Sequence, residues 1–149
     1  MLSPDEALRQ LLIGAAGNSD ATKAALSGLV GSRAYAIEAP QGAPDPRIEF
    51  HLVSGPSEYT HDGEAGLTHP RFQVECYGKT AAAALAVRKA AKANLSGFKG
   101  TVNSADGTDS VDVGAIFIEN LASFTYSSPG ADQNIERGYR MDVILWCAE

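Results

Sequence analysis

The sequence predicts an α+β domain in which two or three helices pack on a mainly antiparallel sheet of about five to six strands. Two patterns and their order support this prediction. Apolar residues recur at helical spacing near the start of the chain and in its middle, whereas other stretches alternate apolar and polar residues as half-buried strands do. The segments follow the order helix, helix, strand, strand, strand, helix and then two or three strands. This order is typical of helices that cover an antiparallel sheet.

The first two helices are predicted from their end signals and their apolar spacing. Ser3 and Pro4 suit an N-cap and a first helical residue, so a helix should run to about Ile13. A second helical stretch covers 18–29, and Gly31 follows it as a stop. The expected apolar faces are Leu8, Leu11, Leu12 and Ala15 on the first helix and Ala21, Ala25 and Leu29 on the second.

Alternating stretches predict the first strands. The segment 33–39 is a short strand that a proline-rich loop ends. The segments 47–52 and 71–77 alternate and should pair in antiparallel fashion across a long, polar, glycine-rich loop at 54–70. The residues expected to face the core are Ile48, Phe50 and Leu52 on one strand and Phe72, Val74 and Cys76 on the other.

The second half of the chain begins with the clearest helix. The stretch Ala81–Leu95 is rich in alanine and carries a basic stripe beside its apolar face. Glycines end this helix, and 103–109 is a turn-rich loop. Three strands should follow, at 111–118, 121–126 and 139–147. The apolar face of the helix is Ala84, Val87, Ala91 and Leu95, the basic stripe is Arg88, Lys89 and Lys92, and the alternating residues of the last strand are Tyr139, Met141, Val143, Leu145 and Cys147.

Length and composition fit one domain that covers residues 1–149. The chain is 44% hydrophobic and 20% charged with a formal net charge of −6, values that are typical of a folded soluble protein. The acidic balance argues against bulk binding to nucleic acid or to anionic membranes. The start of the chain lacks a secretory signal and no apolar stretch reaches membrane-spanning length, so a cytosolic protein is expected.

Two short motifs resemble phosphate-related sites but fail at a required position. A phosphate-binding loop needs a glycine five residues before Gly78, where the sequence has Gln73, and Thr80 is therefore predicted to be a helix N-cap. The stretch 103–108 has Ser104 where phosphatases of the haloacid dehalogenase class have a nucleophilic aspartate, and its acids do not fit a calcium loop. We expect a hairpin turn there.

No catalytic residue, metal site or cofactor is predicted. His61, Asp62 and His69 could supply three metal ligands, but they lie in the predicted loop rather than at close spacing on a rigid element. We expect exposed loop residues, with contacts to a partner protein or a metal site as the other interpretations. Cys76 and Cys147 fall in alternating strands and should be buried thiols rather than a disulfide. No paired carboxylates or nucleophile motif stand out.

Several diffuse features follow one another at regular spacing between residues 3 and 98. They are Arg33 and Tyr35 before the proline-glycine loop, a strand that closes with Ser54-Gly55, the approach from Gly66-Leu67 to the strand Arg71–Val74, and the entry to the alanine-rich helix at Tyr77–Thr80. In this order they resemble the tail terminator, or tail completion, family of long-tailed phages and phage-derived gene transfer agents. The last third agrees only in outline, through a strand ending at Trp146, and 119–138 matches no part of the family pattern.

The resemblance implies a structural virion protein that is not an enzyme. Such a protein would form a hexameric ring that caps the head-proximal end of the tail tube, stops its polymerisation and provides the interface for head-tail joining. Its partners would be other copies of itself, the tail tube protein and the connector or neck proteins, and there would be no membrane. DNA would pass through the lumen without specific binding, since the repeated negative charge repels phosphates. The protein would be assembled in the host cytoplasm and located in the virion tail.

A ring needs head-to-tail contacts between unlike surfaces of identical subunits. The acids Asp62 and Glu64 on the loop could meet the basic stripe of the helix. The loops at 54–70 and 126–138 are expected to be mobile in the free monomer and ordered in the ring. The candidate interface residues are Glu58, Tyr59, His61, Asp62, Glu64, Arg88, Lys89 and Lys92.

Three other interpretations stay open. The first is a head-closure or neck adaptor protein of the same particle, which is also small and forms rings. The second is a small metal-dependent hydrolase that uses His61, Asp62 and His69. The third is a monomeric binding module whose target the sequence does not identify.

Overall fold

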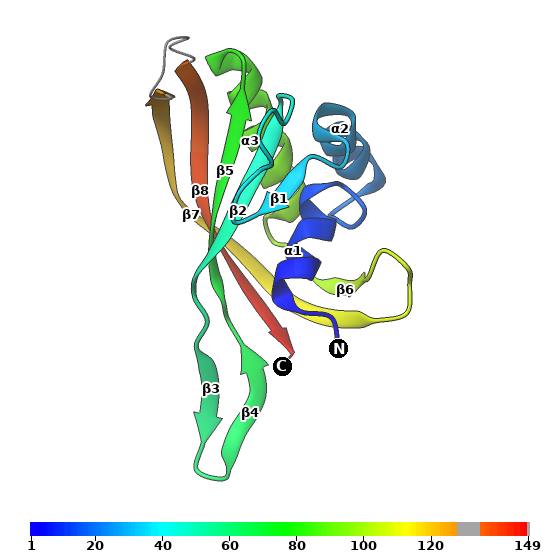
Figure 1. Cartoon of the computed structure of the whole chain (residues 1–149). Helices are drawn as coiled ribbons and strands as arrows, with labels where there is room; N and C mark the ends of the chain where they lie inside the picture. Colours follow the sequence, from blue (N-terminus) through cyan, green and yellow to red (C-terminus); the bar gives the residue numbers. More distant parts are fainter. Residues whose placement is uncertain (128–134, 149) are drawn as a thin grey trace.

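A curled sheet with helices against one of its faces forms the framework of the protein, as the computed structural model in Figure 1 shows. It describes residues 1–127 and 135–148, without the side chains at 58, 64, 65, 126, 127 and 135–137. The elements are α1 (Pro4–Leu12), α2 (Asp20–Val30), β1 (Ala34–Ala36), β2 (Arg47–Ser54), β3 (Ser57–Thr60), β4 (Gly63–Thr68), β5 (Arg71–Gly78), α3 (Ala81–Leu95), β6 (Gly100–Asn103), β7 (Ser110–Ser127) and β8 (Ile135–Ala148).

The strands confirm the predicted α+β class with a mainly antiparallel sheet. Within the described residues the sheet has eight strands, in the order β1-β2-β5-β8-β4-β3, while β7 pairs with both β8 and β6. Only the β1–β2 pair is parallel in this part of the chain. The sheet is larger than expected because 57–60, 63–68 and 100–103 are also strands.

The strand β7 is continuous where two strands were predicted. The expected break between residues 118 and 121 is a β-bulge, at which the pairing with β8 shifts between Glu119 and Ala122. Asn120 has a φ of 53° there, in the left-handed region that an asparagine adopts more readily than most residues. The bulge interrupts the alternation without ending the strand. Part of the loop expected at 126–138 lies outside the described residues, and its ends belong to β7 and β8.

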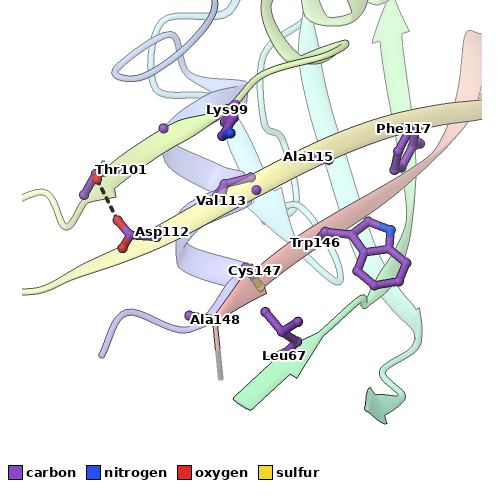
Figure 2. A pocket seen from close by; sticks show the side chains of 12 residues that line it. Leu67, Lys99, Thr101, Asp112, Val113, Ala115, Phe117, Trp146, Cys147 and Ala148 are labelled. Atoms are coloured by element: carbon purple, nitrogen blue, oxygen red, sulfur yellow. Dashed lines mark hydrogen bonds between the residues drawn. The ribbon is translucent and has the colours of Figure 1, made fainter. Parts of the chain in front are cut away.

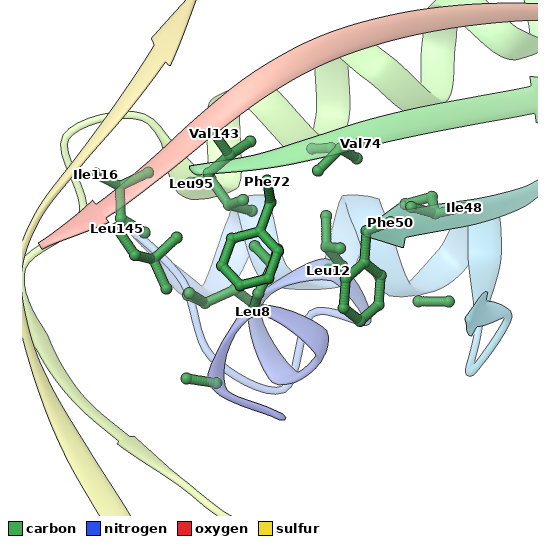
Figure 3. Packing of buried hydrophobic residues seen from close by; sticks show 14 of the residues in the cluster. Leu8, Leu12, Ile48, Phe50, Phe72, Val74, Leu95, Ile116, Val143 and Leu145 are labelled. Carbon is green, nitrogen blue, oxygen red and sulfur yellow. The ribbon is translucent and has the colours of Figure 1, made fainter. Parts of the chain in front are cut away.

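The core lies between the helices and the strand residues that face them, as Figure 3 shows. The alternation of β5 and β8 correctly predicted which residues are buried. Leu52 was predicted to be buried and is 49% exposed, although it still pairs in register with the buried Phe72. The core side chains that Figure 3 labels are Leu8, Leu12, Ile48, Phe50, Phe72, Val74, Leu95, Ile116, Val143 and Leu145.

The predicted apolar face of α2 is confirmed at Leu29, which packs partly buried against the core, and is wrong at both alanines. Ala21 and Ala25 are exposed, whereas Leu26 and Val30 are buried. The helix extends to Val30, and the larger side chains bury more apolar surface than alanines would. In α1 the prediction is confirmed for its three leucines, and Ala15 lies beyond the end of the helix.

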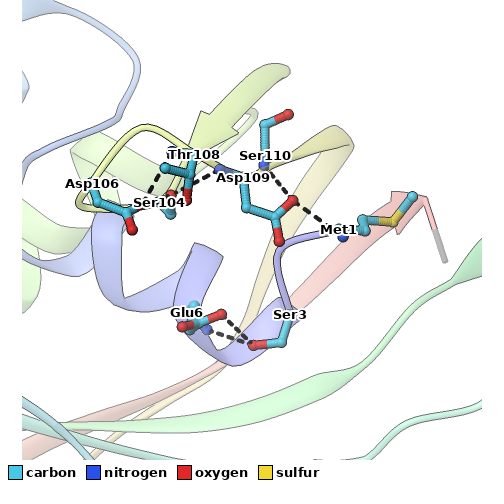
Figure 4. Close-up of polar contacts among 8 residues, drawn as sticks. All are labelled: Met1, Ser3, Glu6, Ser104, Asp106, Thr108, Asp109 and Ser110. Carbon is cyan, nitrogen blue, oxygen red and sulfur yellow. Dashed lines mark hydrogen bonds and ion pairs between the residues drawn. The ribbon is translucent and has the colours of Figure 1, made fainter.

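Each helix begins at a side chain that accepts a hydrogen bond from the first turn. Ser3 Oγ accepts from Glu6 N at 3.3 Å, as Figure 4 shows, and Thr80 Oγ1 accepts from Ala83 N at 3.1 Å. Thr80 is thus the N-cap predicted for α3. A Cβ on Gly78 would lie 2.6 Å from Ala84 N. This glycine is therefore needed for close packing of the helix start on the strand end.

A buried amide joins α3 to the segment between α1 and α2. Asn94 is fully buried, and its Nδ2 donates to Leu11 O at 2.8 Å and to Ala16 O at 2.9 Å. Its Oδ1 accepts from Thr22 Oγ1 at 3.0 Å. A Cβ on Gly17 would lie 1.7 Å from that Oδ1, so only glycine leaves room for the amide. These bonds join the end of α1 and the segment that follows it to α3.

The predicted turn at 103–109 joins β6 to β7 as a hairpin. Asp106 Oδ1 accepts from Ser104 Oγ at 2.6 Å, from Thr108 N at 3.0 Å and from Thr108 Oγ1 at 2.8 Å (Figure 4). These bonds, led by the one from Ser104, lower the pKa of Asp106 to about 2. Gly107 has a φ of 74°, which suits glycine at a tight turn. The acids of this loop thus hold the turn.

The expected loop at 54–70 is wrong, because it contains the two-stranded hairpin β3–β4. We call residues 57–68 the arm. Figure 1 shows that the arm projects from the sheet at the end away from α3. In the part of the chain that the structure describes, Leu67 and Thr68 are the arm residues that pair with the body, at Ala148 and Cys147 of β8. Glycines and acids are poor strand formers, which is why the alternation signal was missing here.

Candidate interaction surface

The candidate metal ligands lie at the two ends of the arm. His61 and Asp62 form its turn, whereas His69 follows β4 at the root of the arm. The six residues of β4 separate them, which at about 3.3 Å per residue is roughly 20 Å. His69 stacks on Trp146 with 4.4 Å between ring centroids. Among the described residues no group of three His, Cys, Asp or Glu side chains could hold a metal ion.

The arm is acidic. Its sequence contains Glu58, Asp62 and Glu64, and no Lys or Arg occurs between Arg47 and Arg71. Tyr59 is 68% exposed, and His61 and Asp62 are also exposed. The side chains of Glu58 and Glu64 lie outside the described residues. The arm therefore offers an exposed aromatic ring among negative charges.

The helix α3 is basic along the flank that was predicted. Between Cys76 and Ala105 the sequence has no acid, and its cations are Lys79, Arg88, Lys89, Lys92 and Lys99. Lys89 and Lys92 are exposed. Arg88 is only partly exposed, because its guanidinium lies over the Tyr139 ring with 5.4 Å from Cζ to the centroid. The Arg88 Nε is buried and has no hydrogen-bond partner. We keep the term basic stripe for Arg88, Lys89 and Lys92.

The arm and the basic stripe do not meet within one chain. In Figure 1, α3 lies behind the upper half of the sheet, whereas β3 and β4 extend beyond its lower end. The predicted pairing of Asp62 and Glu64 with the basic stripe therefore requires two copies of the chain. The structure thus gives one molecule an acidic projection at one end and a basic helix flank at the other.

The face of the sheet opposite the helices carries an apolar groove, which Figure 2 shows from close by. Leu67, Phe117 and Trp146 contribute its large side chains, and its volume is about 730 Å³. Phe117 is 53% exposed and Leu67 is 45% exposed. Sequence analysis did not identify this groove. The signal was present in Phe117 and Trp146, which alternate with the inward residues of β7 and β8.

A charged network lies beside this groove at the bulge of β7. Arg71 donates from Nη2 to Asp142 Oδ2 at 2.8 Å and from Nη1 to Glu119 Oε2 at 3.2 Å. Asn120 Nδ2 also donates to Asp142 Oδ2, at 3.0 Å. Although partial burial opposes ionisation, the hydrogen bonds from Asn120 and Arg71 hold the pKa of Asp142 below its usual value. The network joins the bulge of β7 to β5 and β8.

The two cysteines are buried thiols rather than a disulfide, as predicted. Burial raises the pKa of the Cys76 thiol to about 12. A thiol with such a pKa is protonated at neutral pH and is a poor nucleophile. The cysteines therefore serve as small core residues.

Comparison with known proteins adds no relative to this description. No protein-family model matches this chain, and no curated protein matches it. The likeness to tail terminators rests on the order of sequence features alone. Within the described ranges no helix combines the length and apolar character needed to cross a membrane.

Proposed function

We propose that this protein is a tail terminator subunit, which assembles into a ring on the head-proximal end of a phage-like tail tube. The observation that carries the proposal is the separation of opposite charges on one subunit. An acidic arm at one end and a basic stripe on α3 suit head-to-tail contacts, which close into rings when the rotation permits. The sixfold symmetry and the tail location come from the sequence resemblance.

Two further features support a structural role rather than an enzymatic one. The apolar groove at Phe117 and Trp146 is open and lies near the arm, which suits docking onto another protein surface. The polar groups beside it, Arg71 with Asp142 and Glu119, already bond one another. We assign the interface to Glu58, Tyr59, His61, Asp62 and Glu64 on the arm and to the basic stripe.

The test is to mix the purified protein with tail tubes that lack a terminator and to examine them by electron microscopy. We expect a ring at one end of each tube and arrested tube growth. The double variant Lys89→Glu/Lys92→Glu should lose the ring because it places negative charge opposite the arm. Lys23→Glu, on α2, makes the same type of charge change away from the interface and should cap tubes normally.

Three outcomes would contradict the proposal. Binding to connector proteins but not to tubes would favour a neck adaptor. A monomer by native mass spectrometry at all concentrations, with no tube binding, would favour a binding module. Catalytic turnover that His61→Ala abolishes would favour the hydrolase.

A further inference from the structure

The two lateral edges of the sheet differ in their capacity to accept another strand. At the β1 edge, Arg9 Nε donates to Ala34 O at 3.1 Å and Arg9 Nη2 donates to Ser32 O at 3.2 Å. The next outward carbonyl, of Ala36, accepts from Glu38 N at 2.8 Å. A strand can be added only where backbone donors and acceptors are still available. The β1 edge is therefore closed.

The opposite edge, on β7, is open over much of its length. Its first part is covered, because residues 110–113 pair with β6 and Ile116 O accepts from Gly97 N at 3.1 Å. Beyond that point β7 pairs with β8 on one side, and no strand of the described chain pairs with its other side. We call residues 120–127 the open edge.

The open edge lacks the charged residues and prolines that commonly protect an edge against strand addition. Its sequence, NLASFTYS, contains no charged residue and no proline, although edge strands commonly carry lysine, proline or inward-pointing charges. Leu121 is 42% exposed, and Ser123 and Thr125 are exposed as well. The bulge of β7, between Glu119 and Ala122, includes the first two residues of this segment, and residues 122–127 pair with β8 without a further shift.

A groove lies between the open edge and the start of α3. It has a volume of about 410 Å³ and is lined by Ala81, Ser123, Phe124, Thr125, Gly138 and Tyr139. An added strand would lie about 4.8 Å from β7. Arg88 covers Tyr139, and Lys92 is one turn further along the same flank. An added strand would therefore lie beside the basic stripe, which favours a strand with negative charge.

We infer that the arm of a second copy adds to the open edge as a further strand, with its acids facing the basic stripe. The arm is already extended, and Glu58, Asp62 and Glu64 give it three negative charges without any Lys or Arg. Because an isolated two-stranded hairpin is only marginally stable, pairing with β7 stabilises the arm. The contact joins unlike surfaces, so it repeats from copy to copy. This inference rests on the proposed ring and specifies its subunit contact.

Cysteine cross-linking tests the contact directly. Tyr59→Cys is combined in turn with Leu121→Cys, Ser123→Cys and Thr125→Cys, which sample the open edge at different registers. We expect at least one pair to give disulfide-linked oligomers under mild oxidation, since the native Cys76 and Cys147 are buried. The matched control pairs Tyr59→Cys with Ile37→Cys, which lies directly after β1 and is 81% exposed. This control should give monomers.

A second variant tests the backbone pairing. Along an edge strand, the backbone N–H and C=O groups of alternate residues point away from the neighbouring strand. Those of Ile116 point away from β8, because Ile116 O accepts from Gly97 N. Ser123 has the same orientation, since Ile116 and Ser123 both pair with odd-numbered residues of β8. Ser123→Pro removes an outward N–H and should weaken association at least tenfold, while Ser123→Ala should not. The thermal unfolding midpoint of the monomer shows whether the proline variant still folds.

The outcomes separate this inference from the proposed function. Rings that cap tubes but cross-link through Ile37, or that tolerate a folded Ser123→Pro variant, overturn the arm-to-edge contact and leave the proposed function standing. A protein that neither caps tubes nor associates overturns both. Cross-linking through the open edge without tube capping supports the contact and contradicts the tail terminator role.

Discussion

The helix-covered part of the sheet and the arm are both antiparallel β-structure, yet different interactions stabilise them. In the body, residues such as Phe72 and Val143 are fully buried between the sheet and the helices. In the arm, Tyr59 is 68% exposed, and two residue pairs with β8 connect the hairpin to the rest of the sheet. The body is stable through its own core, whereas the arm presents a surface whose contacts must come from elsewhere. Burial in the core and exposure on the arm thus characterise different regions of the sheet.

The largest expected difference between the body and the arm is in the free energy of unfolding when one aromatic ring is removed from each. Phe72→Ala should lower the free energy of unfolding by about 4 kcal/mol, because it leaves a cavity in the core. Tyr59→Ala should change it by less than about 0.5 kcal/mol, as is usual at exposed positions. Urea unfolding followed by circular dichroism measures both. Equal losses would show that the arm contributes to the folded core.

A smaller effect is expected from removing a buried amide. Asn94→Ala should cost about 3 kcal/mol, because the hydrogen bonds of a fully buried amide to Leu11 O and Ala16 O are lost. Asn18 is the matched control, since its exposed Nδ2 also donates to two carbonyls, those of Ala93 and Ser96. Asn18→Ala should cost about 1 kcal/mol, because water can replace the amide. The two unfolding midpoints in urea should therefore differ clearly, and coincident midpoints would contradict the assigned burial.

The smallest effect concerns an exposed hairpin turn, which is the element of the body most like the arm. The pKa of Asp106 is lowered to about 2 from 3.8, so its ionised form stabilises the fold above pH 4. This stabilisation is lost as the pH falls from about 4 to about 2. Asp106→Asn and Ser104→Ala should both reduce the loss of stability over this range, as thermal unfolding at several pH values would show. An unchanged pH profile in both variants would mean that the turn bonds do not form.

The body was largely predictable because its physical signals are local. The alternation of Met141, Val143 and Leu145 follows from strand geometry and correctly gave the buried face of β8. Ser3 and Thr80 marked helix starts because their hydroxyls accept hydrogen bonds from backbone groups close in sequence. The burial of Asn94 was missed, since its partners are distant in the chain and a polar residue in a helix normally faces water.

The candidate surface was predicted only in part. Exposure of His61 and Asp62 was foreseen, but the strands around them were not, because Gly63 and Gly66 lack strand propensity and their pairing depends on the distant β8. Arg88 was predicted only as part of the basic stripe, and its guanidinium lies on Tyr139, a contact that depends on how α3 packs against the sheet. The sequence identified an acidic segment and a basic segment, and the structure places them at opposite ends of the molecule.

The pairing of Arg9 with the carbonyls of β1 has a consequence for aggregation. Because one flank of the sheet is closed by this guanidinium, copies cannot stack flank to flank into an endless cross-β fibril with these two edges alone. The Arg9 side chain thereby limits the polymers that a subunit with an unprotected opposite edge can form. Any particle that needs many subunits at high local concentration benefits from such a restriction.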